Sequence, residues 1–102
     1  MAFMAACLNG HKDFVQLILN HPDKTIELNV KNNIGLTGYM LACNTRNKDV
    51  VKLVLEYSEE RYIDKSEPNN LSIEMKTFID NLSIEININQ EKQRKRRKLS
   101  TI

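Results

Sequence analysis

Apolar residues recur with helical spacing in two short segments near the start of the chain. The first segment, residues 2–8, is rich in small and apolar side chains and is followed by Asn9-Gly10, a turn signal. The second segment, residues 12–19, has apolar side chains on more than one face, namely Phe14, Val15, Leu17, Ile18 and Leu19. This distribution is typical of a helix that is covered on two sides. The pattern predicts a helical hairpin that ends at Pro22.

The same pattern returns 36 positions later. Residues 2–19 read AFMAACLNGHKDFVQLIL, and residues 38–55 read GYMLACNTRNKDVVKLVL. Repetition of one supersecondary unit indicates stacked units that bury their apolar faces against each other. We therefore predict a helical solenoid in which equivalent residues of the two copies are buried. These residues include the pairs Cys7/Cys43, Val15/Val51 and Leu17/Leu53.

The connection between the two copies is polar and carries turn chemistry. Residues 29–36 read NVKNNIGL, and Gly35 can take the positive φ that a tight turn needs. Thr37 follows and can cap a helix over residues 38–44 by accepting a bond from a free backbone N–H. A second helix is predicted from residue 47 or 48 through Tyr57.

Beyond Tyr57 the repeat weakens. Asn70 stands where Gly35 stood, and Ser72 where Thr37 stood, so the same left-handed turn and helix cap are expected there. A helix with apolar positions from Ile73 to Leu82 follows. Alternating isoleucines in residues 81–89 allow a short strand, although a loop or an extension of the helix is favoured. We divide the chain into unit one (1–28), unit two (29–62), a degenerate capping unit (63–89) and a tail (90–102).

Charge separates the tail from the rest of the chain. Residues 1–89 hold nine Lys or Arg against twelve Asp or Glu, and residues 90–102 hold six against one. The body is thus mildly acidic, with a net charge of −3, and the tail is basic, with a net charge of +5. So charged a tail cannot bury a core and is expected to be disordered or a solvated helix.

Neither a membrane span nor a signal peptide is evident. No apolar run approaches the roughly 18 residues of a spanning helix. The first residues lack the charged and long apolar stretches of a secretory signal. These features predict an intracellular protein, either cytoplasmic or nuclear.

The repeat resembles the ankyrin repeat, a β-turn followed by two antiparallel helices in about 33 residues. The segment ACLNGH (6–11) is similar to the corner between the family's helices, and residues 13–19 and 49–55 are similar to its second helix. The segment LNVKNNIGLT (28–37) is similar to its turn. Together these stretches cover about residues 2–57, with a weaker echo to Leu82, and the chain as a whole amounts to about two and a half repeats. The resemblance implies an all-α, ankyrin-type solenoid of stacked helix-turn-helix repeats with β-turn fingers.

Departures from the family pattern predict low stability. The first helix of unit two begins with Gly38 where the family has a proline, and Met40 replaces its histidine. Glycine at that position is about 0.8–1 kcal/mol less favourable than alanine by helix propensity. Stacks usually need about three repeats. A monomer of this chain is therefore expected to be marginally stable.

The resemblance also implies where a partner protein binds. Ankyrin repeats use the tips of their β-turn fingers and their first helices. On this chain the implied partner-binding residues are Lys31, Asn32, Asn33, Ile34, Leu36 and Tyr39. Further candidates on the first helices are Phe3, Ala5, Leu8, Leu41 and Asn44. Tyr39 and Leu36 have a second interpretation, as residues that pack between the turns.

The basic tail suggests another possible site. Its positive side chains are Lys92, Arg94, Lys95, Arg96, Arg97 and Lys98. Such a cluster is found in nuclear-import signals and in arms that contact phosphate, and also in tails that only add solubility. No aromatic side chain lies among these residues, which argues against binding of single-stranded nucleic acid.

The sequence gives little support for a metal site, a catalytic site or a disulfide. His11 and His21 lack the companions of a zinc site, and His11 is interpreted as a capping residue. No catalytic triad order or phosphate-binding glycine loop is present. Cys7 and Cys43 would lie about one repeat apart, too far for a disulfide. We predict no enzyme activity, no metal and no cofactor.

Three hypotheses follow. The first is a non-catalytic module that binds an unidentified protein through its turn tips and inner helices. The second is a nuclear or nucleic-acid-associated factor that acts through the basic tail. The third is a degenerate remnant of a longer ankyrin protein.

Overall fold

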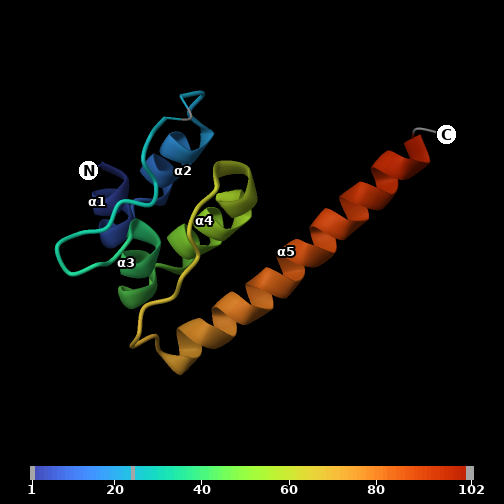
Figure 1. The fold of residues 1–102 in the computed structure, drawn as a ribbon. Coiled ribbons are helices and arrows are strands. Elements are labelled where there is room, and N and C mark those ends of the chain that lie inside the picture. The colour runs from blue at the N-terminus through green and yellow to red at the C-terminus, as the bar shows by residue number, and fades with distance from the viewer. Residues whose placement is uncertain (1, 24, 101–102) are drawn as a thin grey trace.

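A computed structural model describes residues 2–23 and 25–100, with side chains up to Gln93. This part of the chain contains helices α1 (Ala2–Asn9), α2 (Lys12–Asn20), α3 (Gly38–Asn44), α4 (Lys48–Arg61) and α5 (Ile73–Ser100), and no strand (Figure 1). The predicted all-α solenoid with two helical hairpins is confirmed.

The two hairpins stack in register. The α1 helix packs against α3, and α2 packs against α4, so each helix lies beside its counterpart one repeat later (Figure 1). The residues at the centre of this contact are almost without solvent exposure, namely Cys7, Val15, Ala42, Cys43, Val51 and Val54. The equivalence of the two copies in sequence is thus an equivalence in packing.

The predicted helix caps are present. Thr37 Oγ1 accepts a hydrogen bond from Met40 N–H at 3.2 Å, and Ser72 Oγ accepts one from Met75 N–H, also at 3.2 Å. Gly35 takes the expected positive φ of 83°. The prediction of a left-handed turn at Asn70 is wrong. The residue with a positive φ after α4 is Tyr62, with φ of 55°, and Asn70 does not have one. His11 is also not a side-chain cap: it stands at the start of α2, but its imidazole caps no backbone N–H.

The outer side of the first hairpin is not covered. Phe14 is 45% exposed and Leu17 is 62% exposed, although the sequence predicted that α2 would be covered on both sides. The prediction that Leu17 is buried is wrong, whereas Val15 and Val51 are buried. The α2 helix packs against α4 and against α1, and the side that carries Phe14 and Leu17 faces neither of them. Burial of the side that carries Phe14 and Leu17 would require a further helical unit beside it. The apolar periodicity of α2 does not show whether such a neighbour is present.

The α5 helix takes the place of a third hairpin. Met75, Ile79 and Leu82 are buried where α5 packs against α4. An ion pair between Lys48 Nζ and Glu74 Oε1, at 2.8 Å, also joins the two helices, and it lowers the pKa of the Glu74 carboxyl. Beyond this contact α5 runs away from the stack (Figure 1).

The helix continues through the predicted boundary between residues 89 and 90. The expectation of a disordered tail is therefore corrected for residues 90–100, which are helical in the structure. Glutamate, glutamine, lysine and arginine dominate this stretch, and all four are strong helix formers. With no glycine or proline after Pro68 in the sequence, nothing ends the helix early. Of the two expectations for the tail, the helical one is seen in the backbone of residues 90–100.

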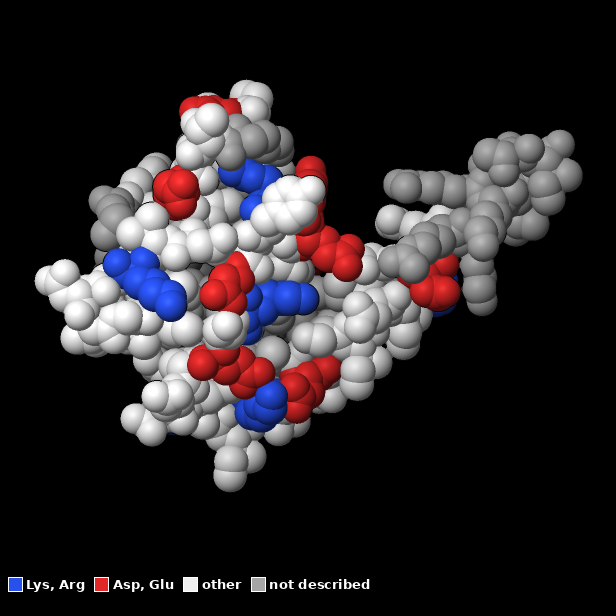
Figure 2. Space-filling model, in the orientation of Figure 1, with Lys and Arg blue, Asp and Glu red and all other residues white. Residues whose placement is uncertain are grey.

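Charged side chains are interspersed on the face of the stack that Figure 2 shows, where Lys and Arg lie beside Asp and Glu. Within residues 2–23 and 25–100, no helix combines the length and the apolar character required to cross a membrane.

Candidate protein-binding surface

The finger between the hairpins, residues 29–37, is held in shape by the side chain of Asn32. Its Oδ1 accepts hydrogen bonds from Ile34 N–H at 3.0 Å and from Leu36 N–H at 2.9 Å. Two backbone bonds close the same turn: Asn32 N–H donates to Leu36 O at 2.9 Å, and Gly35 N–H donates to Asn32 O at 3.0 Å. Because its carboxamide oxygen is engaged inside the turn, Asn32 supports the finger and presents little of itself to a partner.

The tip of the finger projects from the stack (Figure 1). Lys31, Asn33 and Ile34 are exposed, and Ile34 is 76% exposed. Leu36 is half-buried at the base of the finger. A large aliphatic side chain on a braced turn is an available contact for a partner, since little conformational entropy is lost when it binds.

Tyr39 does not belong to this surface. It is only 1% exposed, because α3 packs against α1 at this point and Leu28 is buried in the same core. Burial raises the pKa of the Tyr39 phenol strongly, and the nearby Cys43 raises it further. The second interpretation of Tyr39, packing between the turns, is the one that the structure shows. Phe3 is likewise buried.

The buried hydroxyl of Tyr39 leads to a prediction. Among the described residues it makes no hydrogen bond of ordinary geometry, and the Cys43 thiol beside it is at best a weak partner, whereas an unpaired buried hydroxyl costs about 1–3 kcal/mol. Tyr39→Phe should therefore stabilise the fold by about 1 kcal/mol, with partner binding unchanged. Chemical denaturation, followed by circular dichroism, measures the change. A loss of stability would show that the hydroxyl has a partner in solution.

The first helices contribute a second part of the candidate surface. Ala5, Leu8 and Asn44 are exposed, and Leu41 is half-buried. Leu8, near the end of α1, is a large apolar residue that is 45% exposed. The ankyrin resemblance implied a larger set of partner-binding residues. The fingertip and these positions on the first helices are the members of that set that solvent reaches.

The basic cluster is only partly described. Lys92 is exposed on α5. The side chains of Arg94, Lys95, Arg96, Arg97 and Lys98 lie outside the described residues, although the backbone there is helical. The structure thus brings the tail into a helix that points away from the finger (Figure 1).

Polar bridges between the two hairpins were not found by sequence reasoning. Asn47 Nδ2 donates to Cys7 O at 3.0 Å and to Leu8 O at 3.3 Å, at the end of α1. Arg61 Nη1 donates to Ile18 O at 3.2 Å and to Leu19 O at 2.5 Å, at the end of α2. Each bridge joins residues about 40 positions apart, so no local sequence pattern predicts it.

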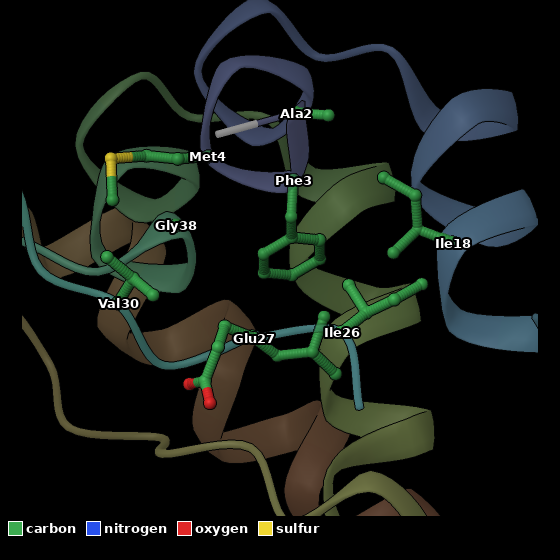
Figure 3. A pocket seen from close by; sticks show the side chains of 9 residues that line it. Ala2, Phe3, Met4, Ile18, Ile26, Glu27, Val30 and Gly38 are labelled. Atoms are coloured by element: carbon green, nitrogen blue, oxygen red, sulfur yellow. The ribbon is translucent and has the colours of Figure 1, made fainter. Parts of the chain in front are cut away.

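An apolar groove is the other feature that sequence reasoning missed. It has a volume of about 400 Å³ and lies between the start of α1, the end of α2 and the segment 26–30. Phe3 points into it, with Ile18 and Ile26 nearby, and the Glu27 carboxylate stands at its rim (Figure 3). The periodicity of no single helix predicts this groove, since its walls come from α1, α2, the segment 26–30 and Gly38 at the start of α3.

The cysteines are buried and free. Burial raises the pKa of the Cys7 thiol to about 12 and that of Cys43 to about 11, so both are protonated at neutral pH and chemically inert. Among the described residues, no group of three or more His, Cys, Asp or Glu side chains is placed to hold a metal ion.

Comparison with known proteins gives one match. A family model that describes ankyrin repeats in three copies matches residues 1–69, which extends the resemblance past the turn at Tyr62. No curated protein and no solved structure gave a match. Ankyrin repeats are generally protein-protein interaction modules. The family match covers most of the chain and agrees with the stacked hairpins and the finger, so the chain belongs to the ankyrin-repeat family.

Proposed function

We propose that this chain is a non-catalytic module that binds one partner protein through the fingertip and the exposed positions of α1 and α3. The observation that carries the proposal is Ile34, which is 76% exposed on a finger braced by the Asn32 side chain. Interfaces are anchored by a few large side chains that insert into pockets of the partner. Ile34 would be such an anchor, with Lys31 and Asn33 beside it on the finger and Leu8 as a further exposed apolar contact on α1.

The first step of the test is to identify the partner at the fingertip itself. A photo-crosslinking amino acid placed at Asn33 of the full chain should capture one protein from a lysate of the source organism. The same group at Glu60, an exposed residue on α4, is the matched control. A protein captured equally by both positions would be a non-specific contact and would count against the proposal.

The second step measures the affinity of the purified partner. Ile34→Ala should weaken binding at least tenfold, about 1.4 kcal/mol, because it removes the anchor. Asn32→Ala should have a similar effect by releasing the turn, whereas Asn32→Asp should retain binding, since a carboxylate oxygen can accept the same two N–H bonds. Isothermal titration calorimetry measures all three. Unchanged affinity for both alanine variants would contradict the proposed site.

The same assay separates the finger from the basic tail. A variant in which Arg94, Lys95, Arg96, Arg97 and Lys98 are replaced by glutamine keeps the full length and the helix propensity of α5. The proposal expects that this variant binds the partner within about threefold of the native chain. A large loss with the tail variant and none with Ile34→Ala would instead assign binding to the tail.

A further inference from the structure

The α5 helix carries apolar side chains on two opposite faces, and the stack covers one of them. Ile79, Leu82 and Ile86 pack against the core on the side of α4. Ile84 and Ile88 lie two positions before and after Ile86, which turns them about 200° away from that face. They are 59% and 50% exposed. The outer face of α5 therefore presents two isoleucines to solvent, one helical turn apart.

Half of α5 extends beyond the stack. Among the described side chains, Ile86 is the last one of this helix that packs against the core, whereas the helix continues to Ser100 (Figure 1). A helix of about 14 residues is only marginally stable in water when nothing packs against it. The projecting half would therefore gain stability from a neighbour, and the two isoleucines indicate the face on which a neighbour would lie.

Charge is separated along the length of α5. Residues 73–91 hold four Asp or Glu against one Lys, and residues 92–100 hold six Lys or Arg and no Asp or Glu. The helix dipole favours such charges only in the first and last turns, so it does not account for Asp80 and Glu85 in the middle of the helix. Both of these residues are exposed. Ile84 and Ile88 lie near the junction of the acidic and basic parts.

This order of charges matches a second α5 helix that runs in the opposite direction. A contact related by a twofold axis requires a surface that is complementary to itself. Placing Ile84 of each copy beside Ile88 of the other centres the contact on residue 86. Residues 92–98 then run beside residues 74–80 of the second copy, so each basic part lies beside an acidic part. A parallel pair would instead bring the two basic parts together, where they repel.

The pattern fits a second copy better than a membrane or a nucleic acid. A helix that lies on a membrane carries basic and apolar residues on opposite faces of the same stretch. In α5 the exposed isoleucines and the basic residues follow one another along the chain instead. Contacts to the phosphates of a nucleic acid would use the basic part and leave Ile84 and Ile88 without a role.

We propose that the chain forms a homodimer through antiparallel pairing of the outer faces of two α5 helices. Ile84 and Ile88 of both copies form the apolar centre of the contact, and opposite charges flank this centre at both ends. The dimer contact is separate from the fingertip of the proposed function and does not depend on it.

Sedimentation equilibrium of the full chain is the first test. We expect a monomer–dimer equilibrium with a dissociation constant below about 100 μM. Ile84→Gln combined with Ile88→Gln should weaken the dimer at least about tenfold, because the apolar centre is lost while a strong helix former is kept. Leu17→Gln, the same kind of change at an exposed position of α2, is the matched control and should leave the dimer intact.

Charge reversal tests the pairing without altering the isoleucines. One variant, Asp80→Lys with Glu85→Lys, makes residues 73–91 net positive. Each variant alone should dimerise at least about tenfold more weakly than the native chain, whereas an equimolar mixture of the two should regain most of the native affinity. Recovery on mixing cannot result from a variant that fails to fold. The second variant makes residues 92–100 net negative through Lys92→Glu, Lys95→Glu, Arg96→Glu and Lys98→Glu.

A spin label determines the direction of the pairing. Thr77 is exposed on α5, so a nitroxide can be attached to Thr77→Cys, while the native Cys7 and Cys43 are buried. In the antiparallel dimer the two labels should lie about 25–30 Å apart, because position 77 lies opposite position 95 of the second copy. A parallel pair would place them about 10 Å apart. Double electron–electron resonance measures this distance.

Three results would overturn the inference. The first is a chain that remains monomeric at about 0.5 mM, including one that binds a DNA duplex or anionic vesicles through the basic part. The second is a dimer that survives the change of both isoleucines to glutamine or is lost with Leu17→Gln. The third is a label distance near 10 Å. None of them touches the fingertip proposal, which is tested by crosslinking at Asn33 and by affinity at Ile34.

Discussion

Replacing Gly10 with alanine should lower the free energy of unfolding by about 3 kcal/mol, enough to reduce the melting temperature by roughly 10 to 20 °C. Gly10 lies between α1 and α2 with φ of 69°, a left-handed conformation that costs other residues about 1–2 kcal/mol. A Cβ atom there would also come within 2.7 Å of Asn47 Oδ1. A domain of this size has little stability to lose.

The clash is costly because Asn47 is not free to move. Its Nδ2 donates to Cys7 O, to Leu8 O and to Thr45 Oγ1, and the first two bonds satisfy the end of α1 from the neighbouring hairpin. An alanine at position 10 would push the carboxamide away from these carbonyls. Each lost bond is worth about 1 kcal/mol. Thermal unfolding followed by circular dichroism measures the total effect.

A double mutant separates the two causes. In an Asn47→Ala background the clash is gone, so Gly10→Ala should cost only the backbone term of about 1–2 kcal/mol, and the two changes should not add. Strict additivity would show that the carboxamide is not the obstacle.

The matched control is Arg46, which occupies the position equivalent to Gly10 with φ of 58°. Arg46→Gly relieves the left-handed strain but enlarges the entropy of the unfolded chain, so a net gain of about 0.5–1 kcal/mol is expected. Removing a glycine at one corner and introducing one at the equivalent corner should therefore change the free energy of unfolding in opposite directions.

Replacing Arg61 with alanine should cost about 3 kcal/mol, although arginine is ordinarily a surface residue. Arg61 is 7% exposed, and its guanidinium donates to the carbonyls of Ile18 and Leu19 at the end of α2. The last turn of α2 has no basic residue of its own, and the positive charge of Arg61 from α4 faces the negative end of the helix dipole. Truncation removes charged hydrogen bonds and leaves an apolar gap.

Arg61→Met distinguishes the contribution of the hydrogen bonds from that of the packing. Methionine keeps much of the apolar stem and removes the cost of burying a charge, so we expect a loss of only about 1–2 kcal/mol. Urea denaturation of both variants gives the comparison. If Arg61→Ala melted within about 2 °C of the native chain, the contacts to Ile18 and Leu19 would not stabilise the stack.

Stacking explains why these two effects should be so large. The two hairpins meet through an apolar centre, and the polar bridges of Asn29, Asn47 and Arg61 close its margins. With only nearest-neighbour contacts, weakening the single interface between the hairpins weakens the whole fold. A change at an exposed position of α5, such as Lys92, should have little effect on stability by comparison.

Much of the candidate binding surface could be named from the sequence, but its extent could not. The finger residues followed from the ankyrin resemblance, and Lys31, Asn33 and Ile34 are indeed exposed. The prediction that Tyr39 contacts a partner was wrong, because the exposure of an aromatic residue depends on what packs against it. Here α1 and the core around Leu28 cover it. The groove escaped notice because its walls are contributed by segments that are distant in the chain.

The sequence by itself determined the repeat, the positions of α1 to α3 and the start of α4, the caps at Thr37 and Ser72 and the turn at Gly35, whereas α4 runs four residues past the predicted end at Tyr57. These features rest on short-range chemistry: helical periodicity, a hydroxyl three residues from an N–H, and a residue without a Cβ atom. Only the tertiary structure decided that Tyr39 is buried, that Phe14 and Leu17 are exposed, and that Asn47 and Arg61 each close the end of a helix in the neighbouring hairpin. Burial and hydrogen bonding across a stack depend on which units are neighbours, and this information is not contained in any one segment of the chain.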